Sequence, residues 1–446
     1  MQKRRYVLVC LFLFVSGLLH ANNFYIDHVA SGTDSGESWA NAWTSFDQIN
    51  WNLFQAGDTL FISGGQQSKT YSNSTLYIHY VKQATEDAPI VITKGKRFPH
   101  AGDVIFEGNS IHPYGIHIDR SNFFKIEHLT LNNFVETGCI HIRWSKGITV
   151  DHCSIRVGGH GGIYSHACTY LNVFNCSITT PVSTNRQNDG IYSQWGNHQV
   201  FANNTIIINN QDIEQHCDAI QCEIDTNITF CNNYIEQSNN KKYNCQGLFA
   251  SNCSGDIVFY NNIVYAPNSE NILIGIQNDG VERNGRMLAF HNTLYGGKWG
   301  TIKVMNAPNS IVKNNIVINY FNPAWAFRLE GAINFPSNID YNIYYTPNSD
   351  ISVSVNLAHK TWEYWKSLGF EKHGMLADPQ LEDVTNRNFH ILPTSPAFGT
   401  GTTLPALFKV DYYGFLRTEG NIDMGALQSG SHMELVSPEN LRFSQP

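Results

Sequence analysis

The chain has 446 residues, of which 42% are hydrophobic and 15% charged, with a net charge of -8. This length corresponds to about two or three ordinary domains, unless stacked repeats build one larger unit in which each repeat packs on its neighbours. A nucleic-acid-binding protein normally shows a basic field, so this mild acidity argues against a nucleic-acid partner.

Residues 1–21 have the features of a signal peptide. Lys3, Arg4 and Arg5 form a positive start, residues 6–19 are a short apolar run, and Ala21 stands at the cleavage position. The run is too short to span a bilayer and no other stretch is long and apolar enough, so we expect no membrane insertion. The sequence therefore predicts a protein that is secreted or periplasmic after cleavage near Ala21.

The rest of the chain divides around a repeating centre. We expect an N-terminal cap and first coils at 22–110, core coils at 111–345, a C-terminal helix and capping segment at 346–428, and a loose tail at 429–446. Within the capping segment, residues 356–368 have the pattern of a short helix, whose Trp362 and Trp365 we expect to pack in the core.

Two runs of alternating residues recur in each repeat of the central region. The first run has an aliphatic or aromatic core position at Ile116, Ile140, Ile163, Ile191, Ile220, Leu248, Ile302 and Phe327. The second begins at Cys153, Cys176, Asn204, Asn233, Asn262, Asn292, Asn315 and Asn342. Period-two runs are typical of strands, and one coil buries its inner face only by stacking on the next. The repeat therefore predicts an all-β solenoid with a column of asparagines at one bend.

Motifs at both ends resemble those of exported pectate-lyase-like proteins, which are right-handed parallel β-helices. The N-terminal motifs lie at 24–27, 38–43 and 56–62, and the C-terminal ones at 377–379, 389–392 and 422–426. The resemblance covers most of the chain and implies the same fold with capped ends. It implies little about the substrate, because this fold carries lyases, hydrolases, epimerases and binding proteins.

Residues that follow the core positions point outward and form two columns. The first column contains His117, His141, Tyr164, Tyr192, Gln221, Phe249, Lys303 and Arg328, and the second contains Asp119, Arg143, His166, Gln194, Glu223 and Ser251. Aromatic rings stack on pyranose faces and polar groups bind hydroxyls, so the columns favour a polysaccharide groove over a merely decorated surface. We expect substrate contacts from His141, Tyr164, Tyr192, Gln194, Gln221, Phe249 and Lys303.

Two aspartates occupy one register on adjacent coils, at the corner that enters the first strand. Asp189 and Asp218 each lie two residues before a core isoleucine, so stacking places them about 5 Å apart. Such a pair either keeps one carboxyl protonated, which suits acid/base hydrolysis, or holds a cation such as Ca²⁺, which suits β-elimination. The alternative is a structural corner in which both side chains bond backbone amides. No cofactor is otherwise implied.

Asn188, Asp189 and Gly190 resemble the corner of the polygalacturonase family, in which that aspartate is catalytic. The histidine expected on the following coil is absent, because Gln246 and Gly247 stand there. A strict polygalacturonase is therefore not expected.

We expect the catalytic group to come from one cluster of side chains. Its members are Asp189, Asp218, Glu223, His216, Arg143 and His166. A lyase would need a base such as Arg143, His166, Tyr192 or Lys303, whereas sparse cations near Asp189 modestly favour hydrolysis. The sequence predicts a monomeric enzyme that cleaves an acidic or decorated polysaccharide by hydrolysis or β-elimination. The alternative is a non-catalytic glycan-binding β-helix protein.

Cys217 and Cys245 stand in one register on adjacent coils. That placement falls within disulfide geometry, so a bridge between them is a hypothesis.

Overall fold

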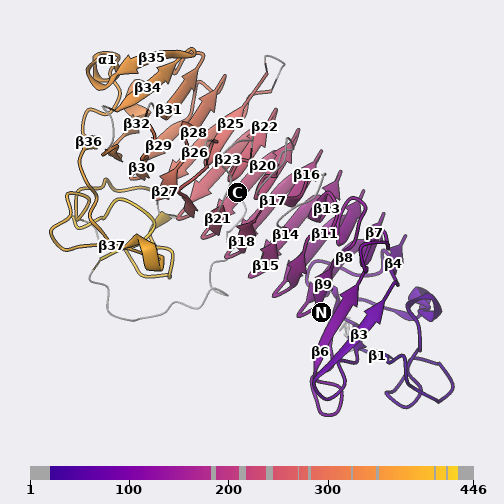
Figure 1. Cartoon of the computed structure of the whole chain (residues 1–446). Coiled ribbons are helices and arrows are strands. Elements are labelled where there is room, and N and C mark those ends of the chain that lie inside the picture. Colours follow the sequence, from indigo (N-terminus) through magenta and orange to yellow (C-terminus); the bar gives the residue numbers. More distant parts are fainter. Residues whose placement is uncertain are drawn as a thin grey trace, which may run out of the picture.

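The chain forms a right-handed parallel β-helix whose coils stack along one long axis (Figure 1). This computed structural model describes residues 21–181, 187–209, 217–237, 245–269, 271–279, 283–322, 325–347, 351–405, 408–417 and 420–429. Within these ranges, three sheets of 12 strands each run along the stack. The fold class predicted from the repeat is confirmed.

The strands of the three sheets follow one another in the order C, A, B around each central coil. Sheet A consists of β1 (Asn23–Ile26), β2 (Thr59–Ile62), β5 (Ile90–Lys94), β8 (Asn122–Glu127), β11 (Lys146–Asp151), β14 (Thr169–Phe174), β17 (Asn197–Ala202), β20 (Thr226–Cys231), β23 (Ser254–Tyr260), β26 (Arg286–Phe290), β29 (Ile311–Lys313) and β32 (Ile339–Asp340). Sheet B consists of β3 (Ser68–Ser72), β6 (Asp103–Glu107), β9 (Thr130–Asn132), β12 (Ser154–Arg156), β15 (Ser177–Thr179), β18 (Thr205–Ile208), β21 (Tyr234–Gln237), β24 (Ile263–Ala266), β27 (Thr293–Gly296), β30 (Ile316–Ile318), β33 (Ile343–Tyr345) and β36 (Met375–Leu376). Sheet C consists of β4 (Leu76–His79), β7 (Ile116–Asp119), β10 (Ile140–Arg143), β13 (Gly161–His166), β16 (Asp189–Gln194), β19 (Ile220–Glu223), β22 (Leu248–Ser251), β25 (Ile274–Gln277), β28 (Trp299–Met305), β31 (Trp325–Glu330), β34 (Ser352–Val355) and β35 (Ala358–Thr361).

The remaining elements are short. They are β37 (Leu381–Asp383), β38 (Asn388–Ile391), the helix α1 (Trp362–Ser367), and the 3-10 helices at Phe46–Gln48, Trp51–Leu53, Pro336–Asn338 and Val384–Asn386.

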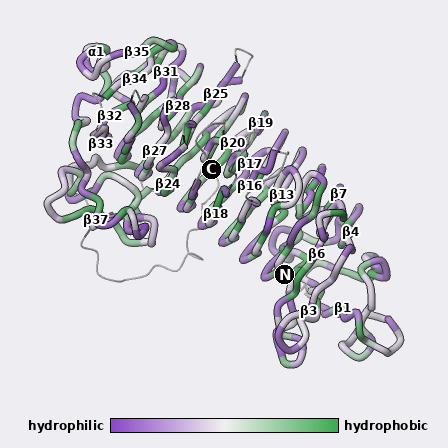
Figure 2. Tube along the Cα trace, viewed as in Figure 1, coloured by the Kyte–Doolittle hydropathy of each residue, from purple (hydrophilic) through white to green (hydrophobic). Residues whose placement is uncertain are grey.

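The interior of the helix is made of the predicted inward column. Ile140 pairs with Ile163, Ile163 with Ile191, and every member from Ile116 to Leu248 is fully buried. Aromatic rings stack from coil to coil as well, with the Phe230 and Phe259 centroids 4.9 Å apart. Hydrophobic residues recur from one end of the stack to the other (Figure 2), because each coil buries one face of each strand.

The predicted asparagine column is a hydrogen-bonded ladder. Among the described residues, five amide-to-amide hydrogen bonds of 2.8–3.0 Å join Asn204, Asn233, Asn262, Asn292, Asn315 and Asn342. Each Oδ1 of the later members also accepts the backbone N–H of the asparagine before it, as Asn262 does from Asn233 at 3.1 Å. The ladder ends on the Glu371 carboxylate, which accepts the Asn342 amide at 2.7 Å. These bonds satisfy buried polar groups along the bend.

The C-terminal helix is shorter than the sequence pattern suggested. It spans Trp362–Ser367 instead of 356–368, because residues 358–361 form β35, which pairs antiparallel with β34 and closes sheet C. The side chain of Trp365 is fully buried and stacks on Phe370 at 3.9 Å, so its predicted core packing is confirmed. This arrangement covers the last coil, which would otherwise expose an unpaired edge.

Cys217 and Cys245 are both buried, and no disulfide joins them in the structure. A hydrogen bond between the two thiols and burial raise the pKa of Cys245. No helix in the described part of the chain is long and apolar enough to cross a membrane.

Candidate functional site

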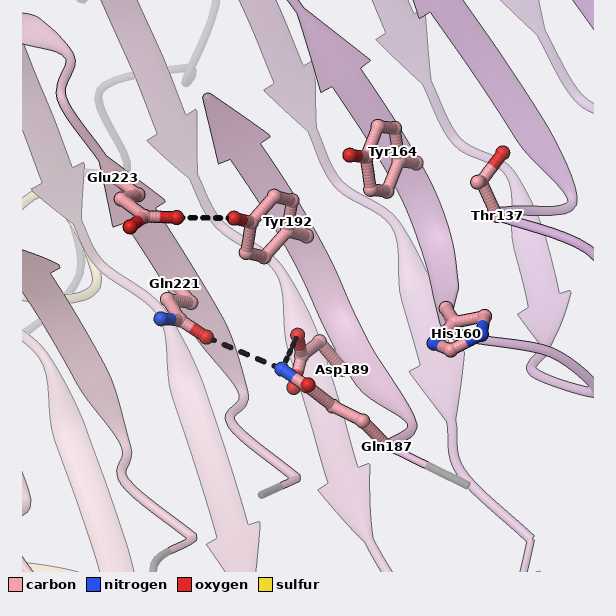
Figure 3. Close-up of a pocket in the computed structure, with 8 residues that line it drawn as sticks. All are labelled: Thr137, His160, Tyr164, Gln187, Asp189, Tyr192, Gln221 and Glu223. Carbon is pink, nitrogen blue, oxygen red and sulfur yellow. Dashed lines mark hydrogen bonds between the residues drawn. The ribbon is translucent and has the colours of Figure 1, made fainter. Parts of the chain in front are cut away.

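A hollow of about 570 Å³ lies on the outer face of sheet C (Figure 3). Its walls come from β13, β16 and β19 and from the segments that precede β10, β13 and β16. The side chains that line it are Thr137, His160, Tyr164, Gln187, Asp189, Tyr192, Gln221 and Glu223. The cavity therefore combines aromatic rings, amides and two carboxyl groups, which is the chemistry expected of a sugar-binding site.

Asp189 and Asp218 stack on adjacent coils as predicted, and both are buried. Asp189 Oδ1 accepts the backbone N–H of Asp218 at 2.8 Å, and Asp218 Oδ1 accepts the backbone N–H of Gln246 at 2.6 Å. Each carboxyl thus accepts a hydrogen bond from the backbone of the next coil. These are the bonds expected if the two aspartates have a structural role at the corner. Asp189 lines the cavity in addition, and Asp218 does not.

Burial raises the pKa of Asp189 well above that of an ordinary aspartate. Burial and the Asp189 charge likewise raise the pKa of Asp218. Burial of both groups opposes ionisation of the two carboxyls together, so the pair favours a state that keeps a proton. The second oxygen of Asp189, Oδ2, accepts the side-chain amide of Gln187 at 2.9 Å, and Gln187 also lines the cavity.

Glu223 is the half-exposed carboxylate of the site. Its Oε2 accepts the Tyr192 hydroxyl at 2.5 Å and the Gln194 amide at 3.1 Å. Burial and Glu223 raise the pKa of Tyr192, so this phenol stays protonated. Tyr164 stacks on Tyr192 with ring centroids 5.1 Å apart, which presents two parallel rings at the cavity wall.

Arg143 and His166 are paired neighbours in the second outward column, but neither lines the cavity. Arg143 Nε lies 3.6 Å from Asp119, and its guanidinium lies 4.9 Å from the centre of the Trp144 ring. His141 is buried one coil before Tyr164, and burial together with His117 and Arg143 lowers its pKa to about 3. These residues form the flank of the site toward the N-terminal coils.

Phe249 and Lys303 lie on the other flank and are nearly covered. Their exposed fractions are 4% each, and the Lys303 ammonium lies over the Phe249 ring at 5.9 Å. Burial and Arg328 lower the pKa of Lys303 to about 8. Neither residue lines the cavity. His216 lies outside the described residues, so its predicted role stays a prediction.

Sequence reasoning did not assign three residues of the cavity wall. Thr137, His160 and Gln187 come from the segments that precede β10, β13 and β16. Loop residues follow no strand period, so periodicity could not find them. The available signal was position alone, since Gln187 immediately precedes the Asn188–Asp189 corner and His160 occupies nearly the same place one coil earlier.

The described residues contain no group of three or more histidine, cysteine or acidic side chains arranged to hold a metal ion. Asp189 and Asp218 each use one oxygen on a backbone amide. A Ca²⁺ ion held by this pair therefore stays a prediction.

Comparison with known proteins identifies the fold. No protein-family model and no curated protein matches the sequence. Among solved structures, pectate lyase Pel9A superposes with a TM-score of 0.60 at 12% identity, covering 92% of this chain and 97% of that one. The chain has the pectate-lyase-like parallel β-helix fold.

Two further structures have the same architecture. The GH136 lacto-N-biosidase from Eubacterium ramulus gives a TM-score of 0.53 at 11% identity, covering 80% of this chain and 68% of that chain. XylC in complex with xylose gives 0.53 at 10% identity, with coverage of 91% and 98%. At these identities the likeness shows the fold alone.

Proposed function

We propose that this protein is an exported carbohydrate-active enzyme that hydrolyses a polysaccharide in the cavity on sheet C. The observation that carries the proposal is Asp189, a buried carboxyl with a raised pKa at the wall of a sugar-sized cavity. A carboxyl whose pKa is raised by burial suits the general acid of glycoside hydrolysis. Export rests on the predicted signal peptide at 1–21.

Asp189 protonates the oxygen of the scissile glycosidic bond in this proposal. Gln187 holds its Oδ2 toward the cavity, and the Asp218 backbone amide holds Oδ1. The leaving sugar departs as its hydroxyl, while a water molecule attacks the anomeric carbon from the opposite face.

Glu223 is the base that activates this water. It belongs to the next coil and lies at the far end of the strand from the Asp189 corner, so the two carboxyls stand apart across the cavity (Figure 3). Tyr192 and Gln194 orient it by donating hydrogen bonds. A base that activates a water on the far side of the sugar ring corresponds to an inverting mechanism.

The stacked rings of Tyr164 and Tyr192 provide a platform for one pyranose face, and Gln221 and Gln187 offer amides to its hydroxyls. The two tyrosine rings are uncharged and lie beside the carboxyl groups of Asp189 and Glu223. This lining suits a sugar that carries substituents.

The test is cleavage of a panel of pectic, alginate, glycosaminoglycan and neutral plant glycans, with and without a chelator. New reducing ends without an unsaturated chromophore support hydrolysis. An unsaturated chromophore would show that the bond is broken by β-elimination instead. Binding without new reducing ends would show a glycan-binding protein.

Variants then test the site. We expect Asp189→Asn and Glu223→Gln each to lower kcat by about 100-fold or more, which is typical of a lost acid or base. Asp225→Asn is the matched control, because Asp225 is a buried aspartate that does not line the cavity. Unchanged cleavage by Asp189→Asn would contradict the assignment, as would an equal loss in the control.

A further inference from the structure

The bend that follows each strand of sheet C forms a continuous column along the stack. At this bend the backbone N–H of one residue donates to the carbonyl of the last strand residue on the next coil, as Trp144 does to His166 at 2.9 Å. The members of this column are Tyr80, Arg120, Trp144, Ala167, Trp195, Ile224, Asn252, Asn278 and Asn306.

The column changes its residue type along the molecule. Asn252 and Asn306 have left-handed backbone, with φ of 53° and 50°, which asparagine tolerates well. Trp144 and Trp195 have φ of 44° and 62° at equivalent bends, and Tyr80 has 57°. A bulky side chain in this region carries a backbone strain of about 1 kcal/mol or more. Arg120, Ala167 and Ile224 have left-handed backbone at the same bend, with φ of 50°, 53° and 61°. The bend thus accepts several residue types, although asparagine suits its backbone best.

The rings at these bends face solvent. Their exposed fractions are 58% for Tyr80, 45% for Trp144 and 54% for Trp195. Packing in the core thus does not account for them. They stand on separate coils with other residue types between them, unlike the contiguous apolar patch of a protein interface.

Guanidinium groups lie between or over these rings. The Arg120 guanidinium lies 5.4 Å from the Tyr80 ring and 4.2 Å from the Trp144 ring, and Arg283 lies 5.9 Å from Trp195. Nearby, one buried carboxylate, Asp119, is shared by Arg120, Arg143 and His79. Around Tyr80 and Trp144, the two guanidinium groups of Arg120 and Arg143 therefore share the single carboxylate of Asp119, although the whole chain is acidic.

The column is continuous with the proposed catalytic cavity. The Trp195 N–H donates to the backbone carbonyl of Glu223 at 3.1 Å, so this ring stands at the bend beside the proposed base. From Trp195 back to Tyr80 there are four coil steps, which span about 19 Å at roughly 4.8 Å per coil. That length accommodates several sugar rings laid parallel to the helix axis.

We propose that Tyr80, Arg120, Trp144 and Trp195, named here the aromatic bend, bind an extended anionic glycan strand that leads into the cavity. Rings stack on pyranose faces, and the interleaved guanidinium groups pair with carboxylate or sulfate substituents. The inference rests on the proposed function, since it extends the same groove, and it names the substrate class as a polyanion.

The test uses asparagine, because it is the residue that the same bend carries on later coils. Trp144→Asn and Trp195→Asn remove the ring while suiting the left-handed backbone, so we expect an unchanged or higher Tm. Binding is measured by affinity electrophoresis in gels that contain polygalacturonate, chondroitin sulfate, dextran sulfate or neutral xylan. Polygalacturonate and dextran sulfate separate carboxylate from sulfate recognition.

We expect retardation of the wild-type protein by at least one polyanion and not by xylan. Each tryptophan variant should bind that polyanion about threefold to tenfold more weakly, the usual worth of one stacking contact. Tyr364→Ala is the control, because Tyr364 is an exposed aromatic residue on α1 at the other end of the molecule. It should bind as the wild type does.

Three results would overturn the proposal. They are equal retardation by xylan, unchanged binding in both tryptophan variants, and a concentration-dependent dimer in sedimentation that those variants abolish. The last result would make the aromatic bend an interface between copies of the chain.

Asp189→Asn separates this proposal from the catalytic one. It should retain polyanion binding while losing cleavage. If no glycan is cleaved but the tryptophan variants still lose binding, the catalytic proposal fails and the aromatic bend stands.

Discussion

Single buried carboxyls in this molecule differ in what surrounds them, and that difference decides their chemistry. Asp189 has a cavity on one side, whereas Asp225 is enclosed at the bend after β19. Burial raises the pKa of Asp225 to about 6, although hydrogen bonds from Gly196, Ser193 and Cys222 lower it in part. The folded state therefore prefers the protonated form of this residue.

This preference makes stability depend on pH. The pKa of Asp225 is about 6 in the folded protein against 3.8 when unperturbed, so its contribution to stability is present below pH 4 and is lost as pH rises through 6. We expect Asp225→Asn to raise Tm at pH 8 and to change it little at pH 4, because the variant has no charge to bury. The difference in free energy is roughly 3 kcal/mol at most. Thermal melting of both proteins across this range checks it, and a variant that is less stable at pH 8 would refute it.

The catalytic proposal has its own pH signature at the same scale. If Asp189 is the acid, activity should persist above the pKa of an ordinary aspartate, since burial raises its pKa, and should fall as the group finally ionises. The pH dependence of kcat, measured for the wild-type protein, checks this expectation.

At the scale of the element, the asparagine ladder connects six consecutive coils of the described structure. Its interior members each bond on both sides, while the first member, Asn204, meets Cys176 on the coil before. The chain itself has cysteine at this register in Cys153 and Cys176. Cysteine is thus accepted at the end of the column.

The ladder can be tested by placing one substitution at two points. We expect Asn262→Cys to destabilise the protein more than Asn204→Cys does, by about 1–3 kcal/mol. The interior change removes the Oδ1 that accepts both the backbone N–H and one side-chain N–H of Asn233, which then keeps only the Phe201 carbonyl. The end change removes only the acceptor of the Cys176 backbone N–H. Chemical denaturation of both variants gives the comparison, and equal losses would show that the ladder is not cooperative.

At the scale of the whole molecule, the C-terminal segment folds back over the stack. Phe389 packs against Tyr234 and Tyr265, with ring centroids 6.3 Å and 5.7 Å apart. Arg417 is buried and donates to Asn261 at 3.1 Å and to the Gly425 and Ala426 carbonyls at 2.9 and 3.0 Å. One buried guanidinium therefore holds the segment to itself and to the coil.

Removing this guanidinium should loosen the segment without unfolding the solenoid. We expect Arg417→Met to make residues beyond about 376 sensitive to limited proteolysis, because several buried acceptors lose their donor. Arg387→Met is the control, since Arg387 pairs with Glu236 at the surface and such pairs contribute at most about 1 kcal/mol. Mass spectrometry of the digests checks both, and equal protection of the two variants would contradict the role of Arg417.

The sequence by itself determined the repeat, the inward register from Ile116 to Leu248 and the asparagine ladder. All three depend on which side of a strand a residue faces. Successive side chains of a strand point to opposite faces, so the sequence alone indicates the side. It also placed Asp189 and Asp218 on adjacent coils. Each aspartate lies two residues before a core isoleucine, and these isoleucines stack on each other.

Only the tertiary structure decided which outward residues are available. Phe249 and Lys303 have outward positions yet are covered by their neighbours, while Thr137, His160 and Gln187 reach the cavity from segments without a period. The aromatic bend became visible only with the backbone angles, because a tryptophan in left-handed backbone looks ordinary in a sequence. Exposure and strain depend on the coils above and below, which no single run of residues contains.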